Sequence, residues 1–320
     1  MSESLVEVRN LDLDYPTRRG VIRAVDKVSI SINRGEILGL VGESGCGKST
    51  FGRALLRLPP SPGEIVGGEI VFDGQDLMEL DEESMRRLRG ARISMVFQDP
   101  MTCLNPLQSI NDHLMETIQA HQTNVSNKEA RELAVSILNR LGIKPERLDD
   151  YPHQLSGGMR QRVMIGLALA LNADLIIADE ATTSLDVIVE AQFLDWLREL
   201  QQELNLTILL ITHNIGVIAE VSDRVAVMYA AKMVELADAF SLFDKPLHPY
   251  TEGLLASVPN IELEEDTLEI MYGSPPNLLK PPRGCRFHPR CPHVMDVCRE
   301  EEPPFREVNP GHWAACWLYE

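Results

Sequence analysis

The chain has 320 residues, of which 44% are hydrophobic and 24% are charged. This composition is typical of a folded globular protein and excludes a disordered chain, a collagen-like repeat and a coiled-coil rod. Thirty lysines and arginines against 48 aspartates and glutamates give a formal net charge of −18. Because this charge opposes binding along a nucleic-acid backbone, we expect no nucleic-acid partner and only local phosphate binding.

The chain carries no obvious membrane or export signal. No apolar run approaches the roughly 20 residues that cross a bilayer. The first residues, MSESLVEVRN, lack a positive leader followed by an apolar segment. We therefore expect a cytoplasmic protein whose six cysteines are reduced rather than paired in disulfides.

The elements predicted in the first hundred residues alternate between strand and helix. The first forty residues favour short strands, among them VSISI at 28–32, before the buried strand ILGLVG at 37–42. A helix follows from Lys48, then a strand at 69–72, a helix with Asp81 as its N-cap and a strand at 93–98. This order predicts an α/β fold.

From about 99 to 172 the pattern becomes mainly helical. Ser126 and Glu129 form a capping-box pattern and Gly142 is a C-cap. The apolar face of this helix is expected to consist of Leu133, Ile137, Leu138 and Leu141. Strands return at 175–178 and 207–211 with a helix between them, and beyond Asp238 prolines become frequent and regular periodicity fades.

A glycine-rich motif joins the strand at 37–42 to the helix that follows. Gly42-Glu-Ser44-Gly45-Cys46-Gly47-Lys48-Ser49, followed by Thr50, fits G-x-x-x-x-G-K-[ST] in the strand–loop–helix setting that a nucleotide-binding P-loop requires. Backbone N–H groups would surround the phosphates, Lys48 would reach the β and γ oxygens, and Ser49 would hold Mg²⁺. We interpret Cys46 as a small residue tolerated in the loop rather than a sensor.

Two carboxylates follow the apolar run Leu175-Ile-Ile-Ala. They lie at the carboxyl end of a predicted buried strand, where open α/β sheets bind ligands. Asp179 is expected to support Mg²⁺ and Glu180 to polarise the attacking water.

Leu155-Ser156-Gly157-Gly158-Met159 resembles the signature sequence of ATP-binding subunits of ABC transporters. The resemblance implies that Ser156 and Gly158 contact a nucleotide held by a second subunit. It also implies roles for Tyr15 on adenine, Gln98 in the Q-loop and at Mg²⁺, Asp186 in the D-loop, and His213 as the switch histidine. Three positions depart from the family pattern, Met159, Ala181 and Asn214, and none removes a group that hydrolysis needs.

The resemblance extends over essentially the whole chain. GGEIVFDGQDL, QDPMTCLNP, YPHQLSGGMRQR and HPYTEGLLASVP are similar to the importer ATPases for oligopeptides, dipeptides and nickel, most closely the D-type subunit. This implies ATP-driven dimer closure with a homologous F-type subunit, two transmembrane permease subunits and an extracytoplasmic substrate-binding protein. The chain would act at the cytoplasmic face of the membrane, and its cargo could be a peptide, a nickel chelate or an oligosaccharide.

The expected fold is a P-loop ABC ATPase core with an antiparallel β subdomain, a helical signature subdomain at about 99–172 and a small irregular cysteine-rich C-terminal domain. The boundaries are 1–237 and 238–320. A soluble ABC protein of DNA repair or of the ribosome is the competing class. The acidic charge, the single cassette and the lack of heptad repeats disfavour it.

Four cysteines, Cys285, Cys291, Cys298 and Cys316, lie in the last 36 residues with the spacing C-x5-C-x6-C-x17-C. Four thiolates can bind a [4Fe–4S] cluster or a structural Zn²⁺. We expect the cluster, because zinc modules favour short C-x2-4-C pairs, and the family resemblance supports it. Because His288, His293 and His312 lie nearby, zinc stays an alternative. Four unligated, reduced thiols are a second alternative. The segment could also act as a separate redox or regulatory module.

Overall fold

The computed structural model describes residues 3–97, 103–122, 124–182, 186–257 and 271–320. The chain divides into two compact units, 1–79 with 210–320 and 80–209. Each unit is described by itself below. In the described ranges, no helix is both long enough and apolar enough to cross a membrane.

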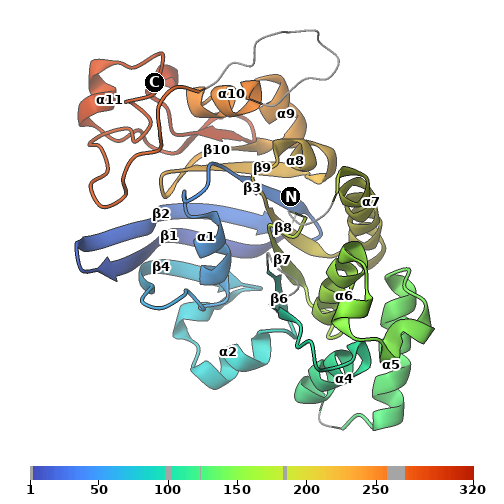
Figure 1. Ribbon diagram of the computed structural model, residues 1–320. Coiled ribbons are helices and arrows are strands. Elements are labelled where there is room, and N and C mark those ends of the chain that lie inside the picture. Colours follow the sequence, from blue (N-terminus) through green and yellow to red (C-terminus); the bar gives the residue numbers. More distant parts are fainter. Residues whose placement is uncertain (1–2, 98–102, 123, 183–185, 258–270) are drawn as a thin grey trace. The chain divides into compact units, whose positions relative to one another are not determined.

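The first unit contains an antiparallel sheet (Figure 1). Its strands are β1 (Ser4–Thr17), β2 (Gly20–Asn33), β4 (Glu64–Phe72) and β5 (Gln75–Asp76), in the order β2-β1-β4-β5. The expectation of short strands was wrong, because β1 and β2 have 14 residues each. Asn10 and Lys27 take positive φ where the register shifts, so bulges interrupt the alternation without ending the strands.

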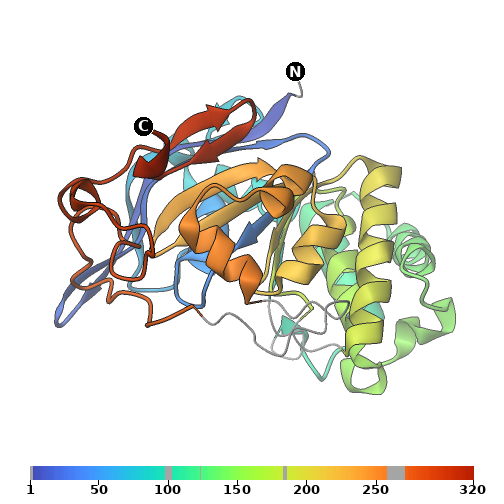
Figure 2. The ribbon, with the colours of Figure 1, turned by 90° about the horizontal axis from the view of Figure 1, so that it is seen from above.

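A second set of strands in the first unit carries the nucleotide motif. Its members are β3 (Ile37–Val41), β9 (Arg224–Tyr229), β10 (Lys232–Asp238), β11 (Arg306–Asn309) and β12 (His312–Ala314). Strand β3 pairs parallel to β9, and the antiparallel order continues through β10 and β12 to β11. Figure 2 shows the C-terminal strand pair in red.

The C-terminal region is more regular than expected. Leu236 of β10 lies opposite Trp313 of β12, so the tail extends the sheet of the first unit. Strands of three and four residues are too short for an alternation to be recognised in the sequence. The helices of this unit are α1 (Lys48–Leu55), η1 (Leu77–Glu79), α8 (Ile215–Val221), α9 (Ala239–Asp244), α10 (Pro249–Ala256), α11 (Asp296–Glu300) and η4 (Trp317–Tyr319).

The second unit combines two parallel strands with helices. Strand β6 (Ile93–Val96) pairs with β7 (Leu175–Asp179). Its helices are α2 (Glu82–Leu88), α4 (Ile110–His121), α5 (Asn127–Arg140), η2 (Pro145–Asp149), η3 (Pro152–Gln154), α6 (Gly157–Leu169) and α7 (Val187–Leu204). The chain passes from the second unit back to the first within β8 (Thr207–Ile211).

The helices α4, α5 and α6 share an apolar core, and α4 and α5 lie side by side (Figure 1). The predicted N-cap Asp81 and the predicted Ser126–Glu129 capping box are confirmed. Of the predicted apolar face of α5, Ile137, Leu138 and Leu141 are buried. Leu133 is 41% exposed, so that part of the prediction was wrong. In the N-terminal half of α5, the buried positions are the smaller Ala130 and Ala134. Their short side chains allow close helix packing.

Candidate nucleotide site

The loop between β3 and α1 is shaped by backbone contacts that only glycine permits. Gly42 has φ 151° and Gly47 has φ 114°. A Cβ on Gly42 would lie 2.0 Å from the carbonyl oxygen of Met228, and one on Gly47 would lie 2.2 Å from that of Ala24. Both distances are far below van der Waals contact, so the spacing of these two glycines is a steric requirement of the fold.

The first turn of α1 carries groups that can bind an anion. Gly47 is its N-cap and supplies no side-chain hydrogen bond to the first turn. Lys48 is 5% exposed, and its Nζ donates to the carbonyl oxygens of Gly42 at 2.6 Å and Glu43 at 3.2 Å. These carbonyl oxygens stabilise the ammonium as dipoles, but they carry no net negative charge. The loop therefore combines backbone N–H donors, a helix N-terminus and an ammonium, which fits a phosphate chain.

The remaining loop residues differ in exposure. Ser44 and Gly45 are exposed, whereas Ser49 and Thr50 are half-buried in the first turn of α1. Cys46 is buried, and burial raises the pKa of its thiol. A protonated, buried thiol is a poor redox sensor, which agrees with its interpretation as a small packing residue.

The two acidic residues lie in the second unit at the end of β7. Asp179 is 4% exposed and Glu180 is half-buried. Glu180 has φ 49°, in the left-handed region that glutamate seldom adopts. Such strain is concentrated at functional sites, where it fixes the direction of a side chain.

The predicted signature turn begins α6 in the same unit. Ser156 is exposed, and its hydroxyl accepts a hydrogen bond from the N–H of Met159 at 3.3 Å. A Cβ on Gly158 would lie 2.7 Å from Cγ1 of Val189 in α7. Asp186 caps α7 by accepting from Val189 N–H at 3.0 Å. The second unit thus brings together the signature turn and Asp186, a proximity that the sequence did not predict.

The other predicted nucleotide-site residues are distributed as follows. In the first unit, Tyr15 is half-buried in β1 and is packed against Gly63, where a Cβ would lie 2.6 Å from the Tyr15 ring. His213 is exposed between β8 and α8. Gln98, predicted for the Q-loop and for Mg²⁺, lies outside the described residues.

The four cysteines of the tail line one small cavity in the first unit, together with His248, His288 and His293. The cavity has a volume of about 10 Å³, enough for about one water molecule. Burial raises the pKa of Cys285 to about 12 and also raises the pKa values of Cys291 and Cys316. Within the described part of the chain, no group of three or more Cys, His, Asp or Glu is placed to hold a metal ion.

His312, considered above as a zinc ligand, is used elsewhere. Its Nε2 lies 2.7 Å from Oε1 of the fully buried Glu235. The same carboxylate accepts the backbone N–H groups of Leu247 and His248. His312 therefore belongs to a structural network rather than to the cysteine cavity.

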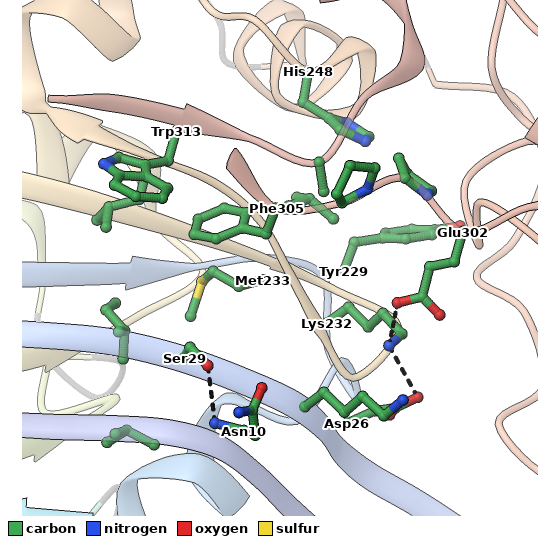
Figure 3. A pocket seen from close by; sticks show the side chains of 18 of the residues that line it. Asn10, Asp26, Ser29, Tyr229, Lys232, Met233, His248, Glu302, Phe305 and Trp313 are labelled. Atoms are coloured by element: carbon green, nitrogen blue, oxygen red, sulfur yellow. Dashed lines mark hydrogen bonds and ion pairs between the residues drawn. The ribbon is translucent and has the colours of Figure 1, made fainter. Parts of the chain in front are cut away.

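Sequence reasoning missed a larger cavity of about 720 Å³ in the first unit. Figure 3 shows Phe305 and Trp313 on one side, where their rings stack with centroids 5.9 Å apart. Lys232 pairs with Asp26 at 3.2 Å and with Glu302 at 2.5 Å, as drawn in Figure 3.

The comparisons with known proteins agree with this arrangement. The ABC transporter family profile matches residues 25–183, and a profile for the oligopeptide/dipeptide transporter C-terminal region matches 234–298. The ATP-binding cassette MJ0796, solved as a dimer in a post-hydrolysis state with ADP and Pi, is similar with a TM-score of 0.66 and 27% identity. The match covers 73% of this chain and 98% of the cassette. The fold and the loop before α1 define an ABC-type ATPase.

Full-length relatives narrow the assignment. The dipeptide transport ATP-binding protein DppD of Bacillus subtilis is 45% identical over 99% of this chain and 96% of the relative. The oligopeptide transport ATP-binding protein OppD of Escherichia coli is 44% identical over 99% of this chain and 94% of the relative. The chain belongs to the family of ATP-binding subunits of the oligopeptide/dipeptide ABC importers.

Proposed function

We propose that the chain hydrolyses ATP to drive import of peptides or related solutes through a membrane permease, from the cytoplasmic face of the membrane. The names of the full-length relatives support peptides as the cargo class. The observation that carries the proposal is the glycine-rich turn at α1, with the buried Lys48, in a chain that also has the signature turn at α6.

We assign the following division of labour in hydrolysis. The N–H groups of the loop and Lys48 bind the phosphates, and Tyr15 stacks on the adenine. Ser49, Asp179 and Gln98 would hold Mg²⁺, which when bound neutralises phosphate charge. Glu180 orients and polarises the attacking water, and His213 donates toward the γ-phosphate. The near-complete burial of Lys48 and Asp179 and the strained backbone of Glu180 support these assignments.

We propose that the site is completed by a second subunit, through Ser156, Gly157, Gly158 and Asp186. Val187 and Ile188, which follow Asp186, are 80% and 71% exposed. Apolar residues exposed beside a signature turn favour an interface with another protein. The D-type character of the chain suggests a homologous F-type subunit as this partner, with two permease subunits and an extracytoplasmic substrate-binding protein.

We also propose domain limits of 1–237 for the nucleotide-binding domain, with its helical part at about 99–172, and of 238–320 for the C-terminal domain. Within the latter, Cys285, Cys291, Cys298 and Cys316 would hold a [4Fe–4S] cluster. Four thiols on one cavity support this donor set. Because burial raises the pKa of Cys285, Cys291 and Cys316, binding through these thiols must release protons and weaken as pH falls.

Protein purified without oxygen tests the cluster. We expect a brown preparation with about four irons per chain and broad absorbance near ~400 nm. A colourless preparation with one zinc per chain would contradict the cluster and support structural zinc. A metal-free preparation would contradict both hypotheses.

The transport function is tested with purified subunits in lipid vesicles. We expect the isolated chain to hydrolyse ATP slowly, and the complete assembly to hydrolyse it faster and to accumulate labelled peptide. Nickel chelates and oligosaccharides are the alternative cargoes in the same assay. A dilute, isolated chain that reached the rate of the full assembly would contradict the composite site.

A further inference from the structure

An ion pair joins the nucleotide loop to the C-terminal tail within the first unit. The guanidinium of Arg290 donates from Nη1 to Oε2 of Glu43 at 2.7 Å and from Nη2 to Oε1 at 2.9 Å. Glu43 is the second residue of the loop 42–49, and 247 positions separate it from Arg290 along the chain. Two parallel charge-assisted bonds fix both the distance and the plane of the carboxylate.

The tail holds Arg290 rigidly for this contact. Its side chain is 5% exposed, and its Nε donates to the carbonyl oxygen of Tyr272 at 3.0 Å. The guanidinium carbon lies 5.8 Å from the ring centre of Tyr229 and 5.9 Å from that of Phe287. A flexible lysine could not reproduce a planar group that is stacked and paired at once.

Glu43 connects its ion pair with Arg290 to Lys48, the residue expected to contact the phosphates. Its backbone N–H donates to the hydroxyl of Tyr250 in α10 at 2.8 Å. Its carbonyl oxygen accepts from Nζ of Lys48 at 3.2 Å. Thus the side chain, the N–H and the carbonyl of one loop residue are each bound, the first two by the C-terminal part of the unit and the third by Lys48.

We propose that Arg290 is a positioning residue for nucleotide binding, which sets the conformation of residues 42–44, and with it the position of Lys48, through Glu43. No contact between Arg290 and the nucleotide is required. The nucleotide affinity of the loop therefore depends on the C-terminal tail, which the ABC profile match at 25–183 does not include.

This role differs from a contribution to stability alone. Replacing a buried ion pair is often neutral for folding when both charges are removed together. Releasing the loop, by contrast, changes the geometry that the phosphates meet. Glu43→Gln keeps the shape and removes the charge, and Arg290→Lys keeps the charge and removes the planar fork.

The test measures binding of Mg-ATP and Mg-ADP by calorimetry, together with KM and kcat of the full assembly. We expect Arg290→Ala and Glu43→Gln each to weaken nucleotide binding about tenfold, roughly the weight of one charge-assisted hydrogen bond. The kcat should stay within about twofold of the wild type at saturating nucleotide, because the groups that act on water are unchanged. Arg290→Lys should restore part of the affinity, and Arg299→Ala, an exposed arginine of the same tail, should behave as wild type.

The double variant Glu43→Gln/Arg290→Ala decides whether the two residues act together. Coupled residues predict the same tenfold loss as either single variant. Additive losses, unchanged affinity in either single variant, or an affinity loss that follows a lowered melting temperature would overturn the proposal. If Arg290→Ala fails to fold, the affinity of Glu43→Gln alone decides between the two outcomes, since this variant preserves the packing of Arg290 on both rings.

Discussion

Two glycine-containing turns begin helices in this protein, α1 in the first unit and α6 in the second, and they are stabilised differently. The turn at α1 has no side-chain cap. It is fixed by the close backbone contacts of Gly42 and Gly47, by Tyr250 of α10 and by Arg290 of the C-terminal tail. The turn at α6 is capped by its own Ser156. The first is a helix start without a side-chain cap, which suits phosphate binding, whereas the second is capped by its own hydroxyl and is exposed.

This difference separates two functions of one motif type. An uncapped helix start is costly unless a ligand or the surrounding fold stabilises it, so the first turn needs support from distant residues. A self-capped turn needs little support and can present its hydroxyl at a surface. We infer that the α1 turn binds nucleotide within one chain and that the α6 turn serves contact with a second chain.

The strongest test of the first turn is Gly47→Ala. The added Cβ would meet the backbone of Ala24 at 2.2 Å, and φ 114° is strained for alanine. We expect nucleotide affinity to fall at least about 100-fold, since a loop shift of about 1 Å misplaces every phosphate contact. Calorimetric titration with Mg-ATP measures it.

Gly45→Ala is the matched control in the same loop. Gly45 has φ 80°, but among the described residues no atom beyond Gly45 and its two chain neighbours lies within 4 Å of the position of a Cβ. Only backbone strain of about 1 to 2 kcal/mol should then be felt. Equal losses in the two variants would show that the steric argument for Gly47 is incorrect.

Much of this site could be predicted because its motifs are local. The loop, the acidic pair at the end of β7 and the signature turn are each contiguous, and their residue types follow from phosphate and metal chemistry. Local capping rules also predicted Asp81 and the Ser126–Glu129 box. The ion pair of Glu43 with Arg290 could not be predicted, because the pairing partner is 247 positions away.

The departures from the family pattern have local explanations that the sequence alone did not supply. Asn214 caps α8 by accepting from the N–H of Gly216 at 3.1 Å. Ala181 is buried, and Met159 packs against the core of α4, α5 and α6. The exposure of Leu133 was misjudged because periodicity identifies a helix face only to within a residue or so at its edge.

Glu180→Gln separates the rate of hydrolysis from the nucleotide affinity that the two turns determine. If Glu180 polarises water, hydrolysis by the assembly should fall about 100-fold to 10,000-fold, the range for loss of a general base. Nucleotide affinity should persist, because neither turn is altered. Steady-state hydrolysis and Mg-ATP titration give the two quantities, and Glu199→Gln, on the exposed face of α7, is the control. Near-normal turnover would remove Glu180 from its assigned role.

His248, which contacts a residue that supports the turn at α1, should make the stability of the folded chain depend on pH. His248 is buried, and burial lowers its pKa from 6.5 to about 4, opposed by Glu235. Its Nδ1 accepts the N–H of Tyr250, the residue that holds Glu43. Between pH 6.5 and 4 the unfolded chain binds the proton that the folded chain refuses. Stability is therefore full above pH 6.5 and decreases as pH falls, by up to about 3 kcal/mol.

His248→Asn keeps an N-cap acceptor and removes this titration. We expect its denaturant midpoint to change less between pH 6.5 and 4 than that of the wild type. His153→Asn, at an exposed histidine of the second unit, should retain the full dependence. Parallel curves for all three proteins would mean that His248 is protonated as readily in the folded chain as in the unfolded one.

The smallest effect distinguishes the caps themselves. Ser156→Ala removes the acceptor for Met159 N–H, and loss of an N-cap costs about 1 kcal/mol. Ser44→Ala, at an exposed serine of the loop before α1, removes no cap, so its cost should stay within about 0.5 kcal/mol. Urea unfolding of the isolated chain compares them. A second assay measures nucleotide binding and hydrolysis. Ser156→Ala should leave nucleotide binding by the isolated chain unchanged. It should lower hydrolysis in the assembly, because the Ser156 hydroxyl would face the nucleotide of the partner. If Ser156→Ala weakened binding in the isolated chain, the α6 turn would act within its own chain, and the separation of the two turns would fail.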